Sequence, residues 1–195
     1  MALGYIFSKT SAKILKTDLN LPLALTLSVI PDIDILIPFL EHRGPTHSII
    51  LALLAFIPVL AIYRERAVPY LLAVAQHSIV GDYLIGGGTQ LLWPMPTPSY
   101  GMGLCIHSQT NTVLEWTFFL ASMAITIKTG DLTRFFQPHH SNLILSVPIF
   151  TVLLPTLFSY PLDVPAWLIP PHLVYMCIFA ASLVADLPQI LKKAA

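Results

Sequence analysis

Charged side chains are scarce in this sequence. Only 10% of its 195 residues are Asp, Glu, Lys or Arg, compared with about 25% in an average soluble protein. Disordered chains are rich in charge, so this composition excludes a disordered protein. The net charge is zero, which excludes a basic nucleic-acid-binding protein. Two cysteines, Cys105 and Cys177, are too few for a secreted disulfide scaffold. Hydrophobic residues make up 55% of the chain, which predicts an integral membrane protein.

Long apolar stretches are the main feature of the chain. They predict an all-α, polytopic helical bundle with about six membrane segments, several of them near the minimum of about 17 residues for a span. The stretches cover residues 21–40, 48–63, 68–93, 112–127, 143–160 and 166–185. Pro31, Asp32 and Asp34 interrupt the first stretch, so we expect it to be broken or re-entrant.

The chain shows no linker or internal repeat, so residues 1–195 are predicted to form a single integral membrane domain. Residues 1–20 are basic. Within them, Tyr5 to Lys16 alternates apolar residues with lysines, which predicts an amphipathic segment lying on a membrane face.

Basic residues are distributed unevenly along the predicted topology. With the N-terminus inside, nine of the ten fall on the cytoplasmic side: Lys9, Lys13, Lys16, Arg64, Arg66, Lys128, Arg134, Lys192 and Lys193. Arg43 alone falls outside. This bias predicts a protein of the inner membrane of a prokaryotic cell, with both termini cytoplasmic.

Ionisable side chains interrupt the apolar stretches, where each is costly and therefore indicates function. They lie near the predicted outer ends of the segments: Asp32, Asp34, His42, His47, His77, Asp82 and Glu115. Carboxylates combined with imidazoles are typical ligands of Zn²⁺, with Mn²⁺ or Fe as alternatives. The set is large enough for one or two ions. Asp32 and Asp34 could instead cap a broken helix.

Three ordered motifs resemble those of the YdjM-like membrane-bound metal-dependent hydrolases. They are Pro-Asp-Ile-Asp at 31–34, His-Arg-Gly-Pro-Thr-His-Ser at 42–48, and His77 with Asp82 followed by Leu-Leu-Trp-Pro at 91–94. The resemblance covers residues 28–96. It implies a metal-dependent hydrolase that is loosely similar to zinc-dependent phospholipases C.

The spacing of His77 and Asp82 differs from that family, whose members usually place these two residues four apart. Five residues correspond to about 140° around an ideal helix. Either Gly81 carries a bulge that realigns the two side chains, or one of them is not a ligand.

The resemblance and the polar residues together give a functional hypothesis. Asp32, Asp34, His47, His77 and Asp82 are the predicted metal ligands. The predicted catalytic residues are His42 as ligand or general acid, Arg43 as phosphate-binding group, and Glu115. Arg43 could alternatively anchor at the headgroup boundary.

We expect hydrolysis of a phosphoester in a lipid or lipid-linked substrate at the extracytoplasmic membrane surface, with membrane lipids as partners and no nucleic acid. An ion or metal transporter or channel that uses the same buried carboxylates and histidines is the alternative. An inactive scaffold with a structural metal site is a third possibility.

Overall fold

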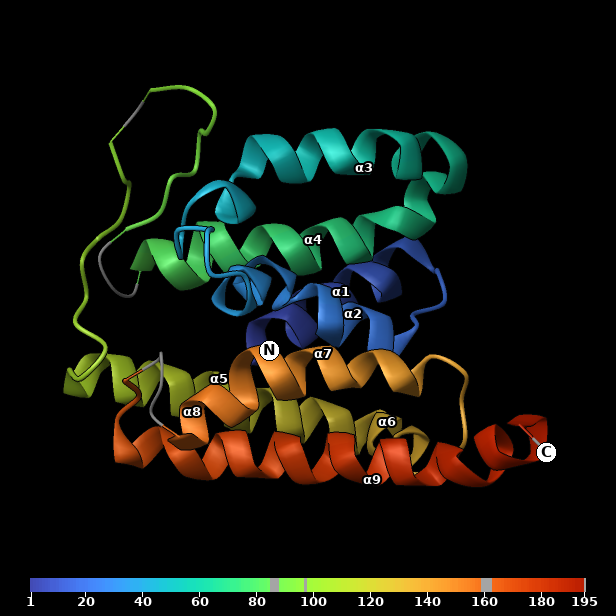
Figure 1. Cartoon of the computed structure of the whole chain (residues 1–195). Coiled ribbons are helices and arrows are strands. Elements are labelled where there is room, and N and C mark those ends of the chain that lie inside the picture. Colours follow the sequence, from blue (N-terminus) through green and yellow to red (C-terminus); the bar gives the residue numbers. More distant parts are fainter. Residues whose placement is uncertain (85–87, 97, 159–162, 195) are drawn as a thin grey trace.

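A computed structural model describes residues 1–84, 88–96, 98–158 and 163–194, with side chains described to residue 188. All regular elements in these ranges are helical (Figure 1). The first half contains α1 (Ala2–Leu15), α2 (Leu21–Leu27), η1 (Ile30–Leu36), η2 (Pro45–His47), α3 (Ile49–Tyr63), η3 (Arg64–Ala67), α4 (Val68–Gln76) and η4 (His77–Asp82). The second half contains α5 (Gln109–Lys128), α6 (Asp131–Arg134), η5 (Asn142–Leu145), α7 (Ser146–Pro148), η6 (Ile149–Leu153), α8 (Leu154–Phe158), η7 (Ala166–Leu168) and α9 (Ile169–Ala194).

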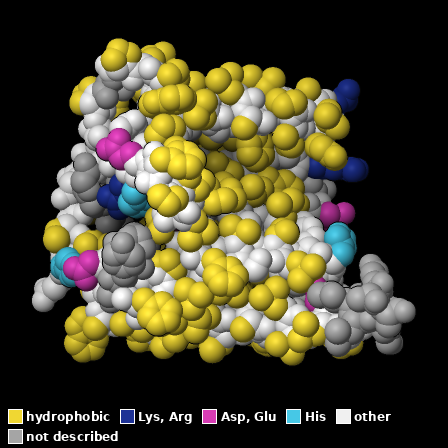
Figure 2. All heavy atoms as spheres, viewed as in Figure 1, with side chains coloured by type: hydrophobic (Ala, Val, Ile, Leu, Met, Phe, Trp, Pro, Cys, Tyr) yellow, Lys and Arg dark blue, Asp and Glu magenta, His cyan; other side chains and the backbone are white. Residues whose placement is uncertain are grey.

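The longer helices run roughly along one direction (Figure 1). On the face shown in Figure 2, charged side chains lie toward the two ends of the molecule and apolar side chains cover the band between them. Among the described residues, one helix, Ala166–Pro188, is long and apolar enough to cross a membrane by length and composition. Asn142–Phe158 is a shorter apolar helix. The prediction of an all-helical protein is therefore confirmed, whereas the prediction of six spans is not.

The first apolar stretch is broken, as its Pro and Asp residues predict. Asn20 caps α2 by accepting a hydrogen bond from the Leu23 backbone N–H at 3.1 Å. The helix ends at Leu27, and Val29 leaves helical geometry at φ −130° and ψ 8°. The chain then continues as the 3₁₀-helix η1, which starts near Pro31. This break turns the Asp-bearing segment away from the axis of α2.

The N-terminal segment packs inside the bundle. One face of α1, including Tyr5, Ser8 and Ala12, is buried, and α1 packs mainly against α4 and α5. Gly4 allows this contact, because a Cβ at that position would overlap the side chain of Ser28. Phe7 and Ile14 on α1 are exposed, so the predicted position of this segment on a membrane face stays a prediction.

The apolar core joins the two halves of the chain. Tyr5 and Leu25 from the first half pack with Phe119, Leu153 and Phe179 from the second half. The phenyl ring of Phe179 is fully buried. Because α1 and α2 contribute to this core, the position of η1, which follows α2, depends on the packing of α5 and α9.

Candidate metal centre

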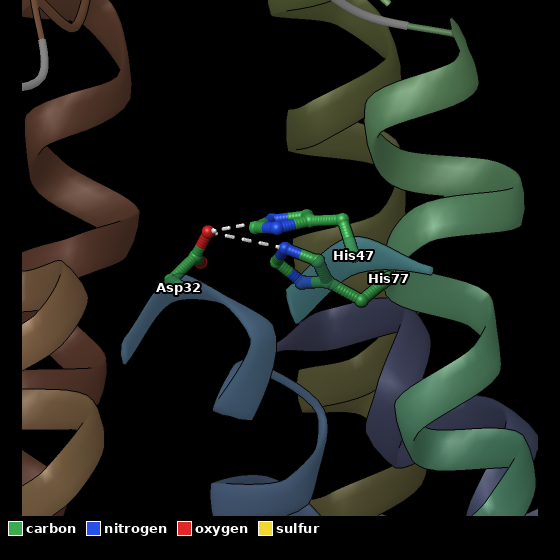
Figure 3. A group of neighbouring side chains, drawn as sticks. All are labelled: Asp32, His47 and His77. Atoms are coloured by element: carbon green, nitrogen blue, oxygen red, sulfur yellow. Dashed lines mark hydrogen bonds and ion pairs between the residues drawn. The ribbon is translucent and has the colours of Figure 1, made fainter. Parts of the chain in front are cut away.

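Three segments of the first half bring the polar residues together: η1, the turn that contains η2, and the π-helix η4. Asp32 and Asp34 lie on η1 and are 8% and 2% exposed. His47 is fully buried at the end of η2. Figure 3 shows Asp32 facing both His47 and His77 across the space between these segments.

The π-helix resolves the spacing of His77 and Asp82. An i→i+5 hydrogen-bonding pattern adds one residue to the turn, so residues five apart in sequence lie near one another on the same face. Nε2 of His77 accordingly lies 3.4 Å from Oδ2 of Asp82. The realignment expected around Gly81 is present, since Gly81 lies within η4.

The Nε2 atoms of His47 and His77 each lie close to one carboxylate oxygen of Asp32 and one of Asp82. Nε2 of His47 lies 3.4 Å from Oδ1 of Asp32 and 3.3 Å from Oδ2 of Asp82. Nε2 of His77 lies 3.2 Å from Oδ1 of Asp32 and 3.4 Å from Oδ2 of Asp82. A tetrahedral ion with ligand bonds of about 2.0–2.1 Å spaces its ligand atoms about 3.3–3.4 Å apart. Four of the six edges of such a tetrahedron are therefore already present.

Two atoms of this set are buried without a hydrogen bond among the described residues: Nε2 of His47 and Oδ2 of Asp82. An unpaired buried polar atom is costly. A cation bound between the two atoms would satisfy both of them. The buried Asp and His side chains could thus hold a metal ion.

Hydrogen bonds on the far side of each imidazole fix which nitrogen faces the cluster. Nδ1 of His77 lies 3.0 Å from the backbone oxygen of Ser28. A carbonyl oxygen only accepts, so Nδ1 carries a proton, and Nε2 would present its lone pair when a metal ion replaces the proton shared with the carboxylates. Ser28 lies at the break after α2, so the broken first segment also orients His77.

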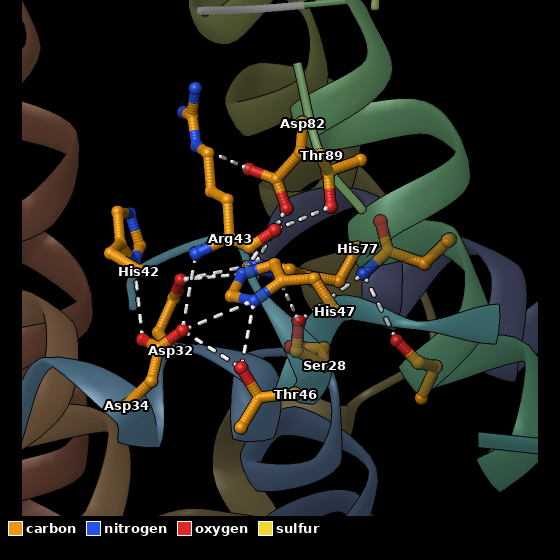
Figure 4. A network of polar contacts seen from close by, with 12 residues as sticks. Ser28, Asp32, Asp34, His42, Arg43, Thr46, His47, His77, Asp82 and Thr89 are labelled. Carbon is orange, nitrogen blue, oxygen red and sulfur yellow. Dashed lines mark hydrogen bonds and ion pairs between the residues drawn. The ribbon is translucent and has the colours of Figure 1, made fainter. Parts of the chain in front are cut away.

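His47 is oriented by a similar arrangement. Its Nδ1 lies 3.0 Å from Oγ1 of Thr46 and 3.3 Å from Oδ2 of Asp34, and the Thr46 hydroxyl donates to the same Asp34 oxygen at 2.8 Å. A proton on Nδ1 of His47 satisfies these acceptors and leaves Nε2 free to bind a metal (Figure 4).

The carboxylates around His47 also stabilise its protonated form. Burial lowers the pKa of His47, but its close contacts with the Asp32 and Asp34 carboxylates and the charge of Asp82 outweigh burial and raise the pKa to about 9. The cluster therefore attracts a cation, and either a proton or a metal ion can meet that requirement.

Asp34, a predicted metal ligand, lies on the opposite side of the His47 ring from the four convergent atoms. Its Oδ1 is 3.0 Å from Nδ1 of His42, and its Oδ2 accepts hydrogen bonds from the Arg43 backbone N–H and the Thr46 hydroxyl. Asp34, His42 and His47 form a second group close enough to hold an ion. That group would use Nδ1 of His47, so the two groups share one imidazole.

A cavity of about 210 Å³ opens in front of the cluster. Asp32, His77 and Asp82 line it together with His42 and Arg43. Nε of Arg43 lies 3.4 Å from Oδ1 of Asp82, and the guanidinium group extends away from the cluster in Figure 4.

The predicted catalytic residue Glu115 lines the same cavity from α5. It does not contribute to the groups of ligand atoms described above. His42, Arg43 and Glu115 thus surround one space, although they belong to different segments. The functional contacts that sequence reasoning missed are those of Thr46 and the backbone oxygen of Ser28. Thr46 lies within the His-Arg-Gly-Pro-Thr-His-Ser motif, which is the only sequence signal for its contacts.

The two ends of the chain lie in different parts of the molecule. Met1 lines the cavity beside the cluster, whereas Lys16, at the other end of α1, lines a surface hollow with Arg64 and Arg66. The first residues of α9 are near the cavity, where His172 lines it, and α9 runs to the opposite end of the molecule (Figure 1). In Figure 1 the N-terminus lies near the middle of the molecule and the C-terminus at one side, and the cytoplasmic location of both termini stays a prediction.

The fold and the cluster define a class: an all-helical protein with an apolar lateral surface and a buried Asp/His site at one end. The sequence matches the family described as YdjM inner membrane protein over residues 1–160. The chain belongs to this family, and its membrane localisation follows from that membership. Comparison with curated proteins and with solved structures gave no match.

Proposed function

We propose that this protein is a metal-dependent hydrolase of phosphoester bonds in a lipid or lipid-linked substrate at the extracytoplasmic membrane surface. The observation that carries the proposal is the convergence of two imidazole nitrogens and two carboxylate oxygens at separations of 3.2–3.4 Å. A single Zn²⁺ fits this donor set, and Mn²⁺ or Fe are alternatives.

Asp32, His47, His77 and Asp82 would hold the ion, and Asp34 would orient His47 rather than bind it. Both oxygens of Asp34 already contact donors on the turn at 42–47. One neutral His47 carries a proton on one ring nitrogen, so it cannot serve both ligand groups at once. This argument favours one ion over two.

A divalent ion bound here would supply a Lewis acid for a phosphoryl oxygen and would lower the pKa of a bound water, which requires one coordination position open toward the cavity. In the proposed reaction, the oxygen of water forms a new P–O bond, the ester P–O bond breaks, and the leaving alcohol takes up a proton. His42 is suited to transfer that proton, since Nδ1 is held by Asp34 at 3.0 Å and the ring lines the cavity.

In this proposal Arg43 and Glu115 contact different groups of the substrate. The Arg43 guanidinium offers bidentate hydrogen bonds to phosphate oxygens, and it lies next to the cluster through Asp82. Glu115 reaches the cavity from α5, where it is placed to accept a proton or a hydrogen bond from the substrate.

Metal analysis of the purified protein tests the proposal. After loading with Zn²⁺ and removal of excess ion, we expect about one equivalent in the wild type and almost none in His47→Ala or Asp82→Ala. His140→Ala is the matched control, because His140 is exposed and distant in sequence. Wild-type protein that retains no Zn²⁺, Mn²⁺ or Fe would contradict the metal site.

The loaded protein should also release phosphate ester products from phospholipids in mixed micelles. Transport of ⁶⁵Zn²⁺ into sealed vesicles without any hydrolysis would instead support the alternative of a metal transporter.

A further inference from the structure

The cavity in front of the cluster has a second polar end, formed by side chains of α5 and α9. Of these side chains, only Glu115 has a role in the proposed hydrolysis. Asn111 and Glu115 from α5 and His172 from α9 line this end. The cavity has a volume of about 210 Å³ and is open on one side, so it offers room for a small polar head group.

Asn111 presents an unpaired acceptor. The residue is 1% exposed, and its Nδ2 donates to the backbone oxygen of Ile106 at 2.8 Å. This hydrogen bond fixes the orientation of the amide group, because Oδ1 could not donate to a carbonyl. Oδ1 is buried and has no hydrogen bond among the described residues. Since such an atom is costly to leave unpaired, it indicates a ligand that donates a hydrogen bond.

His172 adds a second acceptor. Its Nδ1 lies 2.7 Å from the backbone oxygen of Leu168 in the preceding turn, so Nδ1 carries the proton and Nε2 keeps a lone pair. Glu115 adds its carboxyl oxygens at the same end, beside Met1. Three side chains on two helices therefore give this end of the cavity acceptors. Of the aromatic side chains, only Phe118 lines the described part of the cavity, so no aromatic cage for a quaternary ammonium group is formed there.

We propose that the α5–α9 end of the cavity binds a phospholipid head group that carries hydrogen-bond donors, and that it discriminates against choline esters. The inference rests on the proposed function, since the phosphate of the same lipid would lie at the Arg43 end. Hydroxyl groups and primary ammonium groups both donate hydrogen bonds, so either kind of head group meets this requirement. Phosphatidylglycerol and phosphatidylethanolamine represent the two sources, whereas phosphatidylcholine has no head-group donor.

Lipid binding measured without turnover tests this proposal. Detergent-purified protein is titrated with short-chain phosphatidylglycerol, phosphatidylethanolamine and phosphatidylcholine, and the bound fraction is measured by native mass spectrometry. We expect the wild type to bind at least one donor-bearing lipid about tenfold more tightly than phosphatidylcholine. Tighter binding of phosphatidylglycerol would identify a hydroxylated head group, and tighter binding of phosphatidylethanolamine would identify a primary ammonium head group.

Two variants connect the preference to the site. Asn111→Leu and, separately, His172→Leu should reduce the preference to about twofold or less while Zn²⁺ content stays at the wild-type level, which also reports that each variant is folded. Gln109→Leu is the control, because Gln109 is exposed two positions before Asn111. Equal binding of all three lipids by the wild type would overturn the inference, as would a preference that survives in both folded variants.

The two proposals fail in distinguishable ways. If the head-group preference is present but none of the lipids is hydrolysed, the proposed hydrolysis is wrong and the binding site remains. If lipids are hydrolysed without any difference between head groups, the hydrolysis remains and the head-group site is wrong.

Discussion

Nε2 of His77 lies 3.4 Å from Oδ2 of Asp82, although the two residues are five positions apart in a helical segment. The π-helix η4 makes this approach possible, because its wider turn brings positions i and i+5 together. π-Helical turns of this kind occur frequently at functional sites.

Insertion of one alanine after Gly81 should therefore abolish metal binding. The insertion separates His77 from the aspartate by six positions, which an i→i+5 turn does not bring onto one face. We expect a loss of at least about 100-fold in Zn²⁺ affinity, measured by competition with a chelating dye. Gly81→Ala is the control, since an added Cβ meets no atom within 4 Å. Unchanged affinity after the insertion would show that the spacing set by the π-helix is not needed for the site.

Asp34→Asn should weaken metal binding without removing the site. The substitution removes the carboxylate that orients Nδ1 of His47, and loss of such an outer partner typically costs about 10–100-fold in metal affinity. The bound stoichiometry at saturating Zn²⁺ should stay the same as in the wild type. Asp18→Asn is a matched control on an exposed carboxylate. Complete loss of stoichiometric binding in a folded Asp34→Asn protein would identify Asp34 as a direct ligand.

Arg43→Gln should lower kcat/KM for a phosphoester by about 10–100-fold, because a hydrogen bond to a charged group is worth about 1.5–3 kcal/mol. Arg43→Lys should recover part of the loss, since it keeps the charge but not the bidentate geometry. Zn²⁺ content should be unaffected in both variants. Arg66→Gln, at the opposite end of the molecule, is the control. Wild-type kinetics in Arg43→Gln would remove this residue from substrate binding.

The protein should lose stability in acid through Asp131. Burial raises the pKa of this carboxyl, but hydrogen bonds from Lys9, Tyr5 and Thr129 outweigh burial and hold the pKa below its ordinary value. Tyr5 donates to Oδ2 of Asp131 at 2.8 Å, and Lys9 forms an ion pair with the same oxygen. A depressed pKa contributes stability that is complete above the unfolded-state value of about 3.9 and disappears as pH falls through the folded-state value.

Asp131→Asn should reduce the stability near neutral pH by about 1.5–3 kcal/mol, and the difference from the wild type should shrink as the pH falls below about 4. Thermal unfolding in detergent between pH 3 and pH 7 measures both effects. Lys9→Met removes the ion-pair partner and should reproduce much of the change. A difference in Tm that stays constant across the pH range would contradict the role of the Asp131 charge.

Much of the site was predictable from the sequence because its chemistry is carried by few polar residues in an apolar chain. Asp32, His47, His77 and Asp82 are costly in such surroundings, and the spacing of the last two left two possibilities, a bulge near Gly81 or a residue that is not a ligand. The break of the first segment followed from Pro31 and its flanking carboxylates. The packing of α1 against the bundle was not predictable from the sequence. It depends on contacts of Gly4 and Tyr5 with residues that are distant in the sequence.

The sequence by itself determined the class of protein and the inventory of donor atoms, since hydropathy and side-chain chemistry are properties of individual residues. Only the tertiary structure decided how these atoms are used. His47 could bind through either ring nitrogen, and Asp34 could bind a metal or orient a ligand. The contacts of Thr46, Ser28 and Asp34 resolve both questions, because a proton held on Nδ1 of each imidazole leaves Nε2 facing Asp32 and Asp82.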